Sequence, residues 1–518
     1  MNGTARVLLI HPPACKPGEP PAGIARLAAA LRVNGVSCLA VDANLEGMCF
    51  ILERPAEAAD GRTRTALRNR DRNLSELRTG SAFHSIGHYN RIVNDLHRLI
   101  EISGNGTDFT PGLSDSGHRS LSAARSKDLI RCAEQPEKDP FHGYYRSRLL
   151  PLVERTSPEL IGLSVNFLSQ AFHAFSLAGL LRRAFPGLTI ALGGGLVTSW
   201  MRSPGWKDPF QGLADDCVAG PGEAFLLRRM GVFSPSPERP APDFDDLADS
   251  GYLSPGFILP YDASTGCWWR HCRFCPEHAE ANAYSAVPPD RVLADLKRLK
   301  WKTRPSLIHF LDNALAPSLL DRFAAEAPGA PWYGYARLSG QWTDPGFCAA
   351  MKRSGCVLLK IGLESGDPEV LEGMGKGIRI EDASVILRNL RHAGIASYVY
   401  LLFGTPWESE ASAVRTLEFT VRHHPSIGYI NAAVFNLPVS CEDAAVLGTR
   451  PFSEGDLSLY ADFEHPLGWN RIRVRGFLDR VFRRHPAIAA ILARTPKRFT
   501  SNHAPFFHLK GIVPGDRK

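Results

Sequence analysis

The segment Thr265-Gly266-Cys267-Trp268-Trp269-Arg270-His271-Cys272-Arg273-Phe274-Cys275-Pro276 places three cysteines within nine residues. Three thiolates on one short loop point at one soft metal centre, and no second close pair of cysteines follows to complete a four-thiolate zinc set. A three-thiolate loop suits a four-iron cluster in which one iron stays open for a substrate. The competing interpretation is a zinc loop with His271 as fourth ligand, although adjacent His271 and Cys272 would strain a tetrahedral site.

The composition around this loop indicates an ordinary globular protein in a reducing compartment. The chain has 518 residues, enough for about three domains, with 44% hydrophobic and 22% charged residues. Eleven cysteines is an odd number and most of them stand alone, so they do not form a disulfide framework. The net charge of +7 is dispersed, which argues against nucleic acid as a partner. We expect no signal peptide and no membrane span, and predict a cytoplasmic protein.

Strand and helix patterns alternate in residues 1–230. The apolar runs typical of buried strands are Arg6–Ile10, Val36–Val41, Leu160–Asn166 and Leu188–Leu192. This α/β alternation predicts a doubly wound, Rossmann-like parallel sheet, interrupted by an insertion at about 50–150. No G-x-G-x-x-G follows the first strand, so a nicotinamide site is not supported.

Polar residues, prolines and glycines follow these predicted strands. Ligands bind such sheets at the carboxyl ends of the strands, and glycines there let the backbone approach a large ligand. The candidate binding residues are Pro12, Pro13, Ser164, Asn166, Gly193, Gly194 and Gly195. The glycine triplet alone is weak support, because a tight turn explains it equally well.

A Pro-rich linker at 231–250 precedes a second α/β pattern at 251–430. The expected strands include Ser306–Leu311, Trp332–Leu338, Val357–Leu363 and Ala396–Phe403, with helices between them. The pattern predicts a partial or full (β/α) barrel, whose active sites are built where the strands end. Residues 431–518 contain short helical patterns and several aromatics, and predict a small helical C-terminal region that covers the barrel mouth.

Four segments together resemble the radical S-adenosylmethionine (SAM) superfamily. They are the cysteine loop, Ile361–Gly366, Met374–Gly377 and Phe403–Pro406. The resemblance implies that Cys267, Cys272 and Cys275 hold a [4Fe–4S] cluster, and that SAM at the open iron is cleaved to a 5′-deoxyadenosyl radical. It also implies an electron donor such as flavodoxin or ferredoxin.

Six more residues match positions that contact SAM in the family. Phe274 would contact the adenine, Asp312 and Asn313 the methionine amino group, Glu364 the ribose hydroxyls, and Lys376 and Arg337 the carboxylate. The residue types suit these roles, because a cation pairs with a carboxylate and a carboxylate accepts from hydroxyls. One departure is the spacing of the first two cysteines, which are separated by four residues where the family has three. We expect the extra residue to bulge out of the loop.

Residues 1–230 resemble the cobalamin-binding domain that precedes the radical domain in one branch of the superfamily. The common Asp-x-His-x-x-Gly motif is absent after the first strand, where His11 is out of pattern, so the lower face of cobalt is expected to lack that ligand. Ser164 and the glycines at 193–195 would line the nucleotide tail of cobalamin.

The leading functional hypothesis from this resemblance is a cobalamin-dependent C-methyltransferase. The alternatives are a cobalamin-dependent cyclase or rearrangement enzyme that moves no methyl group, and a metal-stabilised binding protein without activity. The substrate stays open, since a small molecule, a peptide or a lipid all fit.

Overall fold

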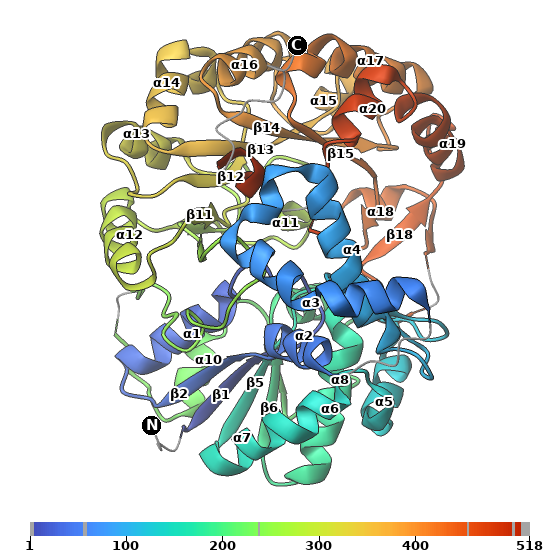
Figure 1. Cartoon of the computed structure of the whole chain (residues 1–518). Coiled ribbons are helices and arrows are strands. Elements are labelled where there is room, and N and C mark those ends of the chain that lie inside the picture. The colour runs from blue at the N-terminus through green and yellow to red at the C-terminus, as the bar shows by residue number, and fades with distance from the viewer. Residues whose placement is uncertain (1–4, 55–59, 237–238, 453–454, 500–502, 509–518) are drawn as a thin grey trace.

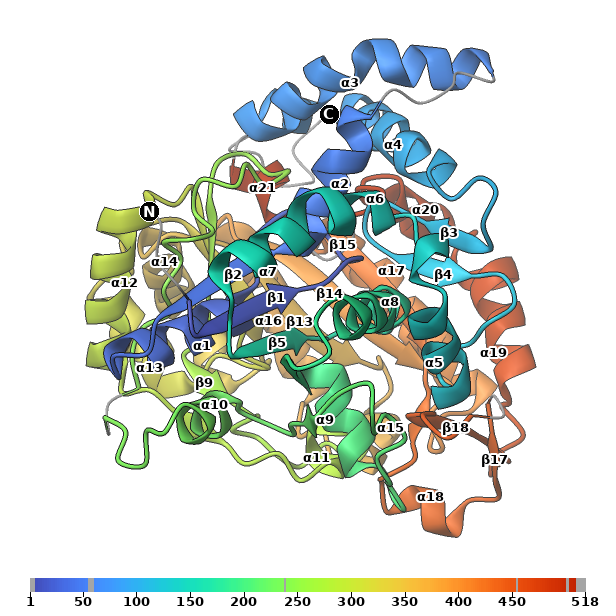
Figure 2. The same ribbon diagram turned by 90° about the horizontal axis from the view of Figure 1, so that it is seen from below.

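The computed structural model describes residues 5–54, 60–236, 239–452, 455–499 and 503–508. Two parallel sheets, each covered by helices, carry the fold. In Figure 1 the N-terminal sheet lies below the barrel strands, and helices α3 (Gly61–Thr79) and α4 (Ile86–Ile102) lie in front of them. Figure 2 shows the same two units from the side of the N-terminal sheet.

The N-terminal sheet has the strand order β2-β1-β5-β6-β7, and its strand pairs are parallel. Its strands are β1 (Val7–His11), β2 (Cys38–Asp42), β5 (Leu160–Ser164), β6 (Thr189–Gly193) and β7 (Asp216–Cys217). Its helices are α1 (Ala22–Val33), α2 (Ala43–Glu53), α7 (Leu150–Thr156), α8 (Leu168–Ala184), α9 (Gly195–Arg202) and α10 (Glu223–Arg229). Successive residues of β1 alternate between two apolar cores, as a strand covered on both faces requires. The doubly wound sheet is confirmed.

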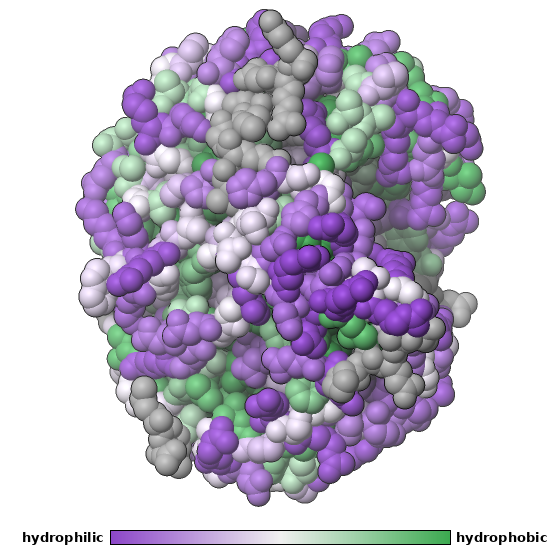
Figure 3. Space-filling model, in the orientation of Figure 1, coloured by the Kyte–Doolittle hydropathy of each residue, from purple (hydrophilic) through white to green (hydrophobic). Residues whose placement is uncertain are grey.

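The insertion is mostly helical and packs against helices α2 and α8 of the N-terminal domain. Besides α3 and α4 it contains α5 (Ser126–Glu134), α6 (His142–Tyr144) and a short hairpin of β3 (Phe109–Pro111) and β4 (Ser116–His118). Asp60 caps α3 by accepting from the Thr63 amide at 2.7 Å. Figure 3 shows that the face over α3 is strongly hydrophilic, consistent with its many arginines.

The second sheet has six parallel strands in the order β15-β14-β13-β12-β11-β8. They are β8 (Ile258–Tyr261), β11 (Leu307–Phe310), β12 (Trp332–Ala336), β13 (Cys356–Glu364), β14 (Ala396–Phe403) and β15 (Tyr429–Val434). Helices α12 (Pro289–Thr303), α13 (Pro317–Ala325), α14 (Pro345–Arg353), α15 (Pro368–Gly373), α16 (Ile380–His392) and α17 (Glu410–His423) alternate with them. Within the described residues β8 does not pair with β15, so the barrel is partial.

Side chains alternate between the inside and the outside of this barrel. Ile308, Leu359 and Val399 pack in the core beneath the helices, whereas Leu307 and Leu358 pack in a separate cluster with residues of β8, β14 and β15. Because a strand repeats every two residues, the positions two further along β11, β12, β13 and β14 also face the barrel interior.

The C-terminal region is only partly helical. It contains α18 (Asp443–Val446), α19 (Arg471–Phe477), α20 (Pro486–Leu492) and α21 (Ala504–His508). It also contains an antiparallel sheet of β16 (Leu437–Pro438), β17 (Thr449–Pro451) and β18 (Tyr460–Phe463), which the sequence pattern did not indicate because these strands are very short. In the described part of the chain, no helix combines the length and the apolar character that crossing a membrane requires.

The close packing of α8 on α5 gives a stability prediction. A Cβ atom at Gly179 in α8 would overlap the backbone of Ala133. Overpacking of this kind costs about 1–3 kcal/mol or more, which exceeds the roughly 1 kcal/mol that alanine gains over glycine within a helix. We expect Gly179→Ala to lower the thermal unfolding midpoint. Gly187→Ala is the matched control, because a Cβ there meets no atom within 4 Å, and its midpoint should equal that of the wild type.

Candidate active site

The cysteine loop follows β9 (Ser264–Thr265) and is held by two tryptophans. The indole of Trp268 donates to the Leu315 carbonyl at 3.2 Å, and that of Trp269 donates to the Gly375 carbonyl at 3.1 Å. The Arg337 guanidinium, at the end of β12, stacks on Trp269 at 3.8 Å from the ring centroid. The two tryptophans therefore position the loop and bring Arg337 beneath it.

The turn Met374–Gly377 packs directly against this loop. The Arg273 amide donates to the Met374 carbonyl at 3.0 Å. Gly375 has a φ of 64°, and a Cβ there would overlap the His271 carbonyl. Only glycine combines that backbone conformation with so close an approach, and this explains why the turn carries glycine beside Lys376.

Arg270, between the first two cysteines, has a φ of 56° and is exposed. A left-handed backbone is uncommon for a residue other than glycine, and here it turns the loop between Cys267 and Cys272. The bulge of an extra residue stays a prediction.

The three thiols lie on this one loop in a half-buried position. Burial raises the pKa of Cys272, with opposing effects of Lys376 and Arg337, and burial raises the pKa of Cys275 to about 11. Arg337 Nη1 lies 4.0 Å from the sulfur of Cys272. Across the described residues, no three Cys, His, Asp or Glu side chains converge as ligands of a single ion would. The cysteines as cluster ligands therefore stay a prediction.

Glu364 and Lys376 form the charged centre of the site. Lys376 Nζ lies 2.8 Å from Glu364 Oε1 and 5.3 Å from the centre of the Phe274 ring. Glu364, at the end of β13, has a φ of 68°, which is a strained backbone conformation of the kind that concentrates at functional sites. A Cβ at Gly362 would overlap the Glu364 carboxylate, so this glycine leaves the space that the ion pair occupies.

The structure thus brings Phe274, Arg337, Glu364 and Lys376 to one place beside the cysteine loop. Asp312 and Asn313 follow β11, and they form hydrogen bonds with the residues at the start of the cysteine loop. The two oxygens of Asp312 accept from the Ser264 hydroxyl at 2.5 Å and the Ala263 amide at 3.1 Å, and Asn313 donates to the Gly266 carbonyl at 3.2 Å. Burial raises the pKa of Asp312 to about 6, against these hydrogen bonds. Contacts of all six residues with SAM stay predictions.

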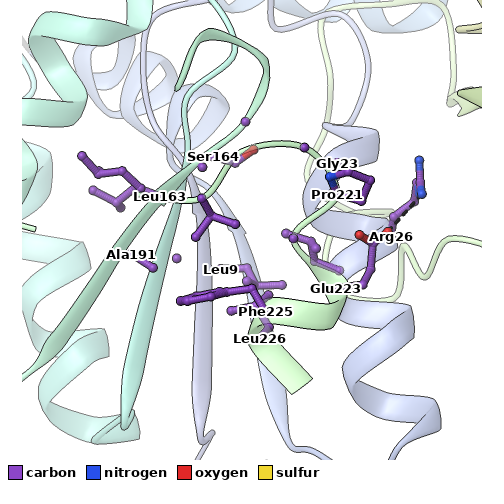
Figure 4. A pocket seen from close by; sticks show the side chains of 18 of the residues that line it. Leu9, Gly23, Arg26, Leu163, Ser164, Ala191, Pro221, Glu223, Phe225 and Leu226 are labelled. Carbon is purple, nitrogen blue, oxygen red and sulfur yellow. Dashed lines mark hydrogen bonds and ion pairs between the residues drawn. The ribbon is translucent and has the colours of Figure 1, made fainter. Parts of the chain in front are cut away.

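A second candidate site is a cavity of about 240 Å³ in the N-terminal domain. It lies over the carboxyl halves of β1, β5 and β6, on the side of α1 and α10, and Figure 4 shows Arg26 and Glu223 beside each other at one edge of it. These two side chains form an ion pair of 3.0 Å. The rest of the lining is mainly apolar or glycine, and its apolar side chains include Leu9, Leu163, Ala191, Leu192 and Phe225.

The structure places the predicted cobalamin residues unevenly around this cavity. Ser164, Asn166, Gly193 and Gly194 line it, whereas Pro12, Pro13 and Gly195 do not. Asn166 joins the ends of β5 and β6, since it donates to the Ser164 hydroxyl at 3.2 Å and accepts from the Gly195 amide at 2.9 Å.

Several lining residues were not predicted from the sequence. They include Leu9, Gly23, Arg26 and Phe225. The Gly220-Pro221-Gly222-Glu223 segment could have indicated this side of the cavity. A glycine-rich turn at a strand end exposes backbone atoms that can contact a ligand. His11 is buried, and its Nε2 atom lies 3.1 Å from the Cys15 sulfur and 3.3 Å from the Gln170 amide nitrogen. The His11 ring therefore contacts Cys15 and Gln170 in the interior of the domain.

The geometry defines an α/β protein whose charged and thiol side chains meet where parallel barrel strands end. The pattern of the family described as the Radical SAM superfamily matches residues 261–420, the span of these elements. The chain therefore carries a radical SAM domain and is an enzyme.

Curated relatives match parts of the chain. An uncharacterized methyltransferase, PH0819, from Pyrococcus horikoshii is 22% identical over 53% of this chain and 66% of its own length. The bacteriochlorophyllide d C-12(1)-methyltransferase of Chlorobaculum tepidum is 32% identical over 35% of this chain and 41% of its own length. The chain thus spans less than two thirds of either relative.

Among solved structures, the radical SAM methyltransferase TsrM from Kitasatospora setae, with cobalamin and a [4Fe–4S] cluster bound, matches 84% of this chain and 76% of its own. The TM-score is 0.49 and the identity is 16%.

The cysteine loop gives a direct prediction on metal content. After anaerobic reconstitution with iron and sulfide, Cys267→Ala, Cys272→Ala and Cys275→Ala should each hold less than half of the wild-type iron, because a three-thiolate site loses a ligand in each variant. Cys49→Ala is the control, since Cys49 lies half-buried in α2 and away from the loop. Wild-type iron content in all three loop variants would contradict the assignment.

The ion pair gives a prediction on SAM binding. Lys376→Met removes the cation beside Glu364, and a charge-assisted hydrogen bond is worth about 1.5–3 kcal/mol, so the Kd for SAM should rise about 10- to 100-fold. Isothermal titration of cluster-loaded protein measures this change. Lys302→Met, which removes only an exposed pair with Asp245, should bind SAM as the wild type does, and an unchanged Kd in Lys376→Met would exclude Lys376 from the site.

Proposed function

We propose that this chain is a cobalamin-dependent radical SAM enzyme that transfers a methyl group to a carbon atom of a small-molecule substrate. The observation that carries the proposal is the cavity of the N-terminal sheet, which accompanies a radical SAM domain in the same chain. Both sites lie where ligands bind in such folds, at the carboxyl ends of parallel strands.

The donor set of the loop fits a [4Fe–4S] cluster. Cys267, Cys272 and Cys275 would supply three soft thiolates, which are the preferred ligands of iron–sulfur clusters. A mononuclear zinc site would hold its sulfurs about 3.8 Å apart, given a Zn–S distance of about 2.3 Å. A cluster is larger and needs no such close convergence of the three sulfurs.

The residues beside the loop fit SAM. Lys376 and Arg337 bring two cations toward the place where a carboxylate would bind, and Glu364 offers an acceptor for hydroxyls. Phe274 supplies an aromatic face next to Lys376. Phe274 comes from the loop, Arg337 and Glu364 from the ends of β12 and β13, and Lys376 from the Met374–Gly377 turn that packs against the loop.

The cavity fits the nucleotide tail of cobalamin. Its apolar side chains suit a flat aromatic ring, and its glycines leave the space that the ring would need. Ser164 and Asn166 add polar groups at the rim. When bound, the cluster with SAM supplies a radical that removes a hydrogen atom from the substrate, and the corrinoid supplies the methyl group.

Methyl transfer is the form of this chemistry that the relatives favour. Two of the curated relatives, PH0819 and the bacteriochlorophyllide d C-12(1)-methyltransferase, are named as methyltransferases. We carry over neither of their substrates, because each match covers only part of the relative.

The experiment is an isotope screen with the reconstituted holoenzyme. Protein loaded with iron, sulfide and hydroxocobalamin is incubated anaerobically with a strong reductant, a small-molecule cell extract and SAM that carries a deuterated methyl group. A methyltransferase yields 5′-deoxyadenosine and an extract compound whose mass gains one deuterated methyl group in place of hydrogen. SAM cleavage without that mass gain would indicate cyclisation or rearrangement, and absence of both would overturn the proposal.

Filling the cavity gives a separate prediction on cobalamin. Gly23 lies in the first turn of α1, and a Cβ there meets only the Ser164 hydroxyl, at 3.7 Å. Gly23→Leu should therefore fold but place its side chain in the cavity, and binding of hydroxocobalamin should fall at least tenfold in a spectroscopic titration. Gly187→Leu is the control outside the cavity, and equal binding by the two variants would remove cobalamin from this site.

A further inference from the structure

A chain of three polar side chains, two of them buried and one half-buried, crosses from the N-terminal domain into the barrel interior. Glu19 lies on the loop between β1 and α1, His309 on β11 and Lys360 on β13. His309 Nδ1 lies 2.9 and 3.0 Å from the two Glu19 oxygens, and His309 Nε2 lies 3.1 Å from Lys360 Nζ. We call these three residues the relay.

The hydrogen-bond pattern defines the direction of the relay. An ionised carboxylate only accepts, so His309 Nδ1 carries the hydrogen that Glu19 binds. His309 Nε2 then has a free lone pair and accepts from the Lys360 amine. In this order of groups the carboxylate fixes the tautomer of the imidazole, and the imidazole in turn orients the Lys360 amine.

The charges of the relay agree with this order. Burial alone would raise the pKa of Glu19, but His309 and Lys16 together hold it well below the usual range, so it is ionised. Burial lowers the pKa of His309 to about 4, and burial together with Lys16 lowers the pKa of Lys360 to about 7, against the attraction of Glu19. At neutral pH His309 is uncharged and a large share of Lys360 is a free amine.

Several other titratable groups face Lys360. Lys16 lies 3.6 Å from Glu19, and Tyr333 and Tyr335 of β12 place their ring centres 5.2 and 5.0 Å from Lys360 Nζ. His503, just before α21, is fully buried, and neither of its ring nitrogens has a hydrogen-bond partner among the described residues. Tyr398 of β14 packs on the His503 ring at 4.3 Å.

The inner face of the barrel is less buried beside and beyond Lys360. Lys360 is 2% exposed, whereas Tyr335, its register partner on β12, and Tyr400, which pairs with Gly362 one step further along, are half-buried, and their hydroxyls lie 3.0 Å apart. Gly362 and Glu364 follow Lys360 on β13 and are also half-buried. A ligand in this part of the barrel would lie between the SAM residues and the Lys360 amine.

We propose that Lys360 is a catalytic base, and that it removes a proton from a conjugated N–H or O–H group of the substrate, with His309 and Glu19 as positioning residues. The proposal rests on the proposed function, since it assigns a substrate to the same barrel. The substrate N–H or O–H bond breaks, its electron pair stays on nitrogen or oxygen, and the proton goes to Lys360 Nζ. Lys360 holds that proton as an ammonium group, which donates to His309 Nε2, and the Glu19 carboxylate balances the new charge through its hydrogen bond with His309. The substrate class is therefore an enol, a phenol or a ring N–H compound.

The first test measures the amine itself and needs no substrate. Reconstituted holoenzyme is labelled with acetic anhydride across a pH range, and acetylation of Lys360 is quantified by peptide mass spectrometry. We expect half-maximal reactivity near pH 7, a lower midpoint in Glu19→Gln, because an attractive anion is lost, and a higher midpoint in Lys16→Met. Lys302→Met should leave the Lys360 midpoint unchanged. Any of three results would overturn the proposal. Lys360 reacts only near the ordinary lysine pKa of about 10.4, Lys360 is not labelled at all, or its midpoint does not change in Glu19→Gln.

The second test uses the substrate that the isotope screen identifies. A general base contributes about 10²- to 10⁴-fold, so Lys360→Met should lower kcat by at least about 10²-fold. His309→Gln and Glu19→Gln should lower kcat less, and Glu19→Gln should also move the rising limb of the pH–rate profile to lower pH. Wild-type turnover by Lys360→Met would refute the relay while leaving the proposed function intact. A holoenzyme that cleaves no SAM would instead refute the proposed function, and the labelling result would still decide the state of Lys360.

Discussion

The packing of the cysteine loop against the Met374–Gly377 turn is the contact on which the rest of the site depends. Two glycines in that turn allow the backbone to approach the loop, and the Trp269 indole and the Arg273 amide fasten the loop to it. Because the turn carries Lys376, the same contact sets the distance between the thiols and the charged residues.

The strain in the site lies where the chemistry is proposed. Glu364 and Arg270 both have left-handed backbones, one at a strand end and the other in the cysteine loop. Neither is glycine, so each conformation costs free energy that the surrounding packing must offset. In contrast, the walls of the barrel are parallel strands whose outer face packs against helices in one large apolar core. The packed barrel strands therefore support the strained backbone at Glu364 and Arg270.

Polar side-chain contacts, in addition to apolar packing, connect the two domains. Glu19 reaches from the loop after β1 to His309 in the barrel, Arg26 of α1 pairs with Asp262 after β8, and Ser199 of α9 donates to Glu280. Each of these contacts starts near the carboxyl edge of the N-terminal sheet. A ligand bound at that edge would therefore lie next to groups that also position the barrel.

The sequence by itself determined the class of fold and the most specific part of the site. Alternating strands and helices predict parallel sheets because each apolar run must be covered on both faces, and three cysteines in nine residues predict a metal loop from local spacing alone. The short strands of the C-terminal sheet and the far wall of the cavity escaped prediction, because both depend on segments distant in the sequence. Only the tertiary structure decided that Asp312 anchors the loop and that Glu19, His309 and Lys360 meet. These three side chains are 341 positions apart at the extremes, from Glu19 to Lys360, and no local pattern reports which buried side chains a folded chain brings into contact.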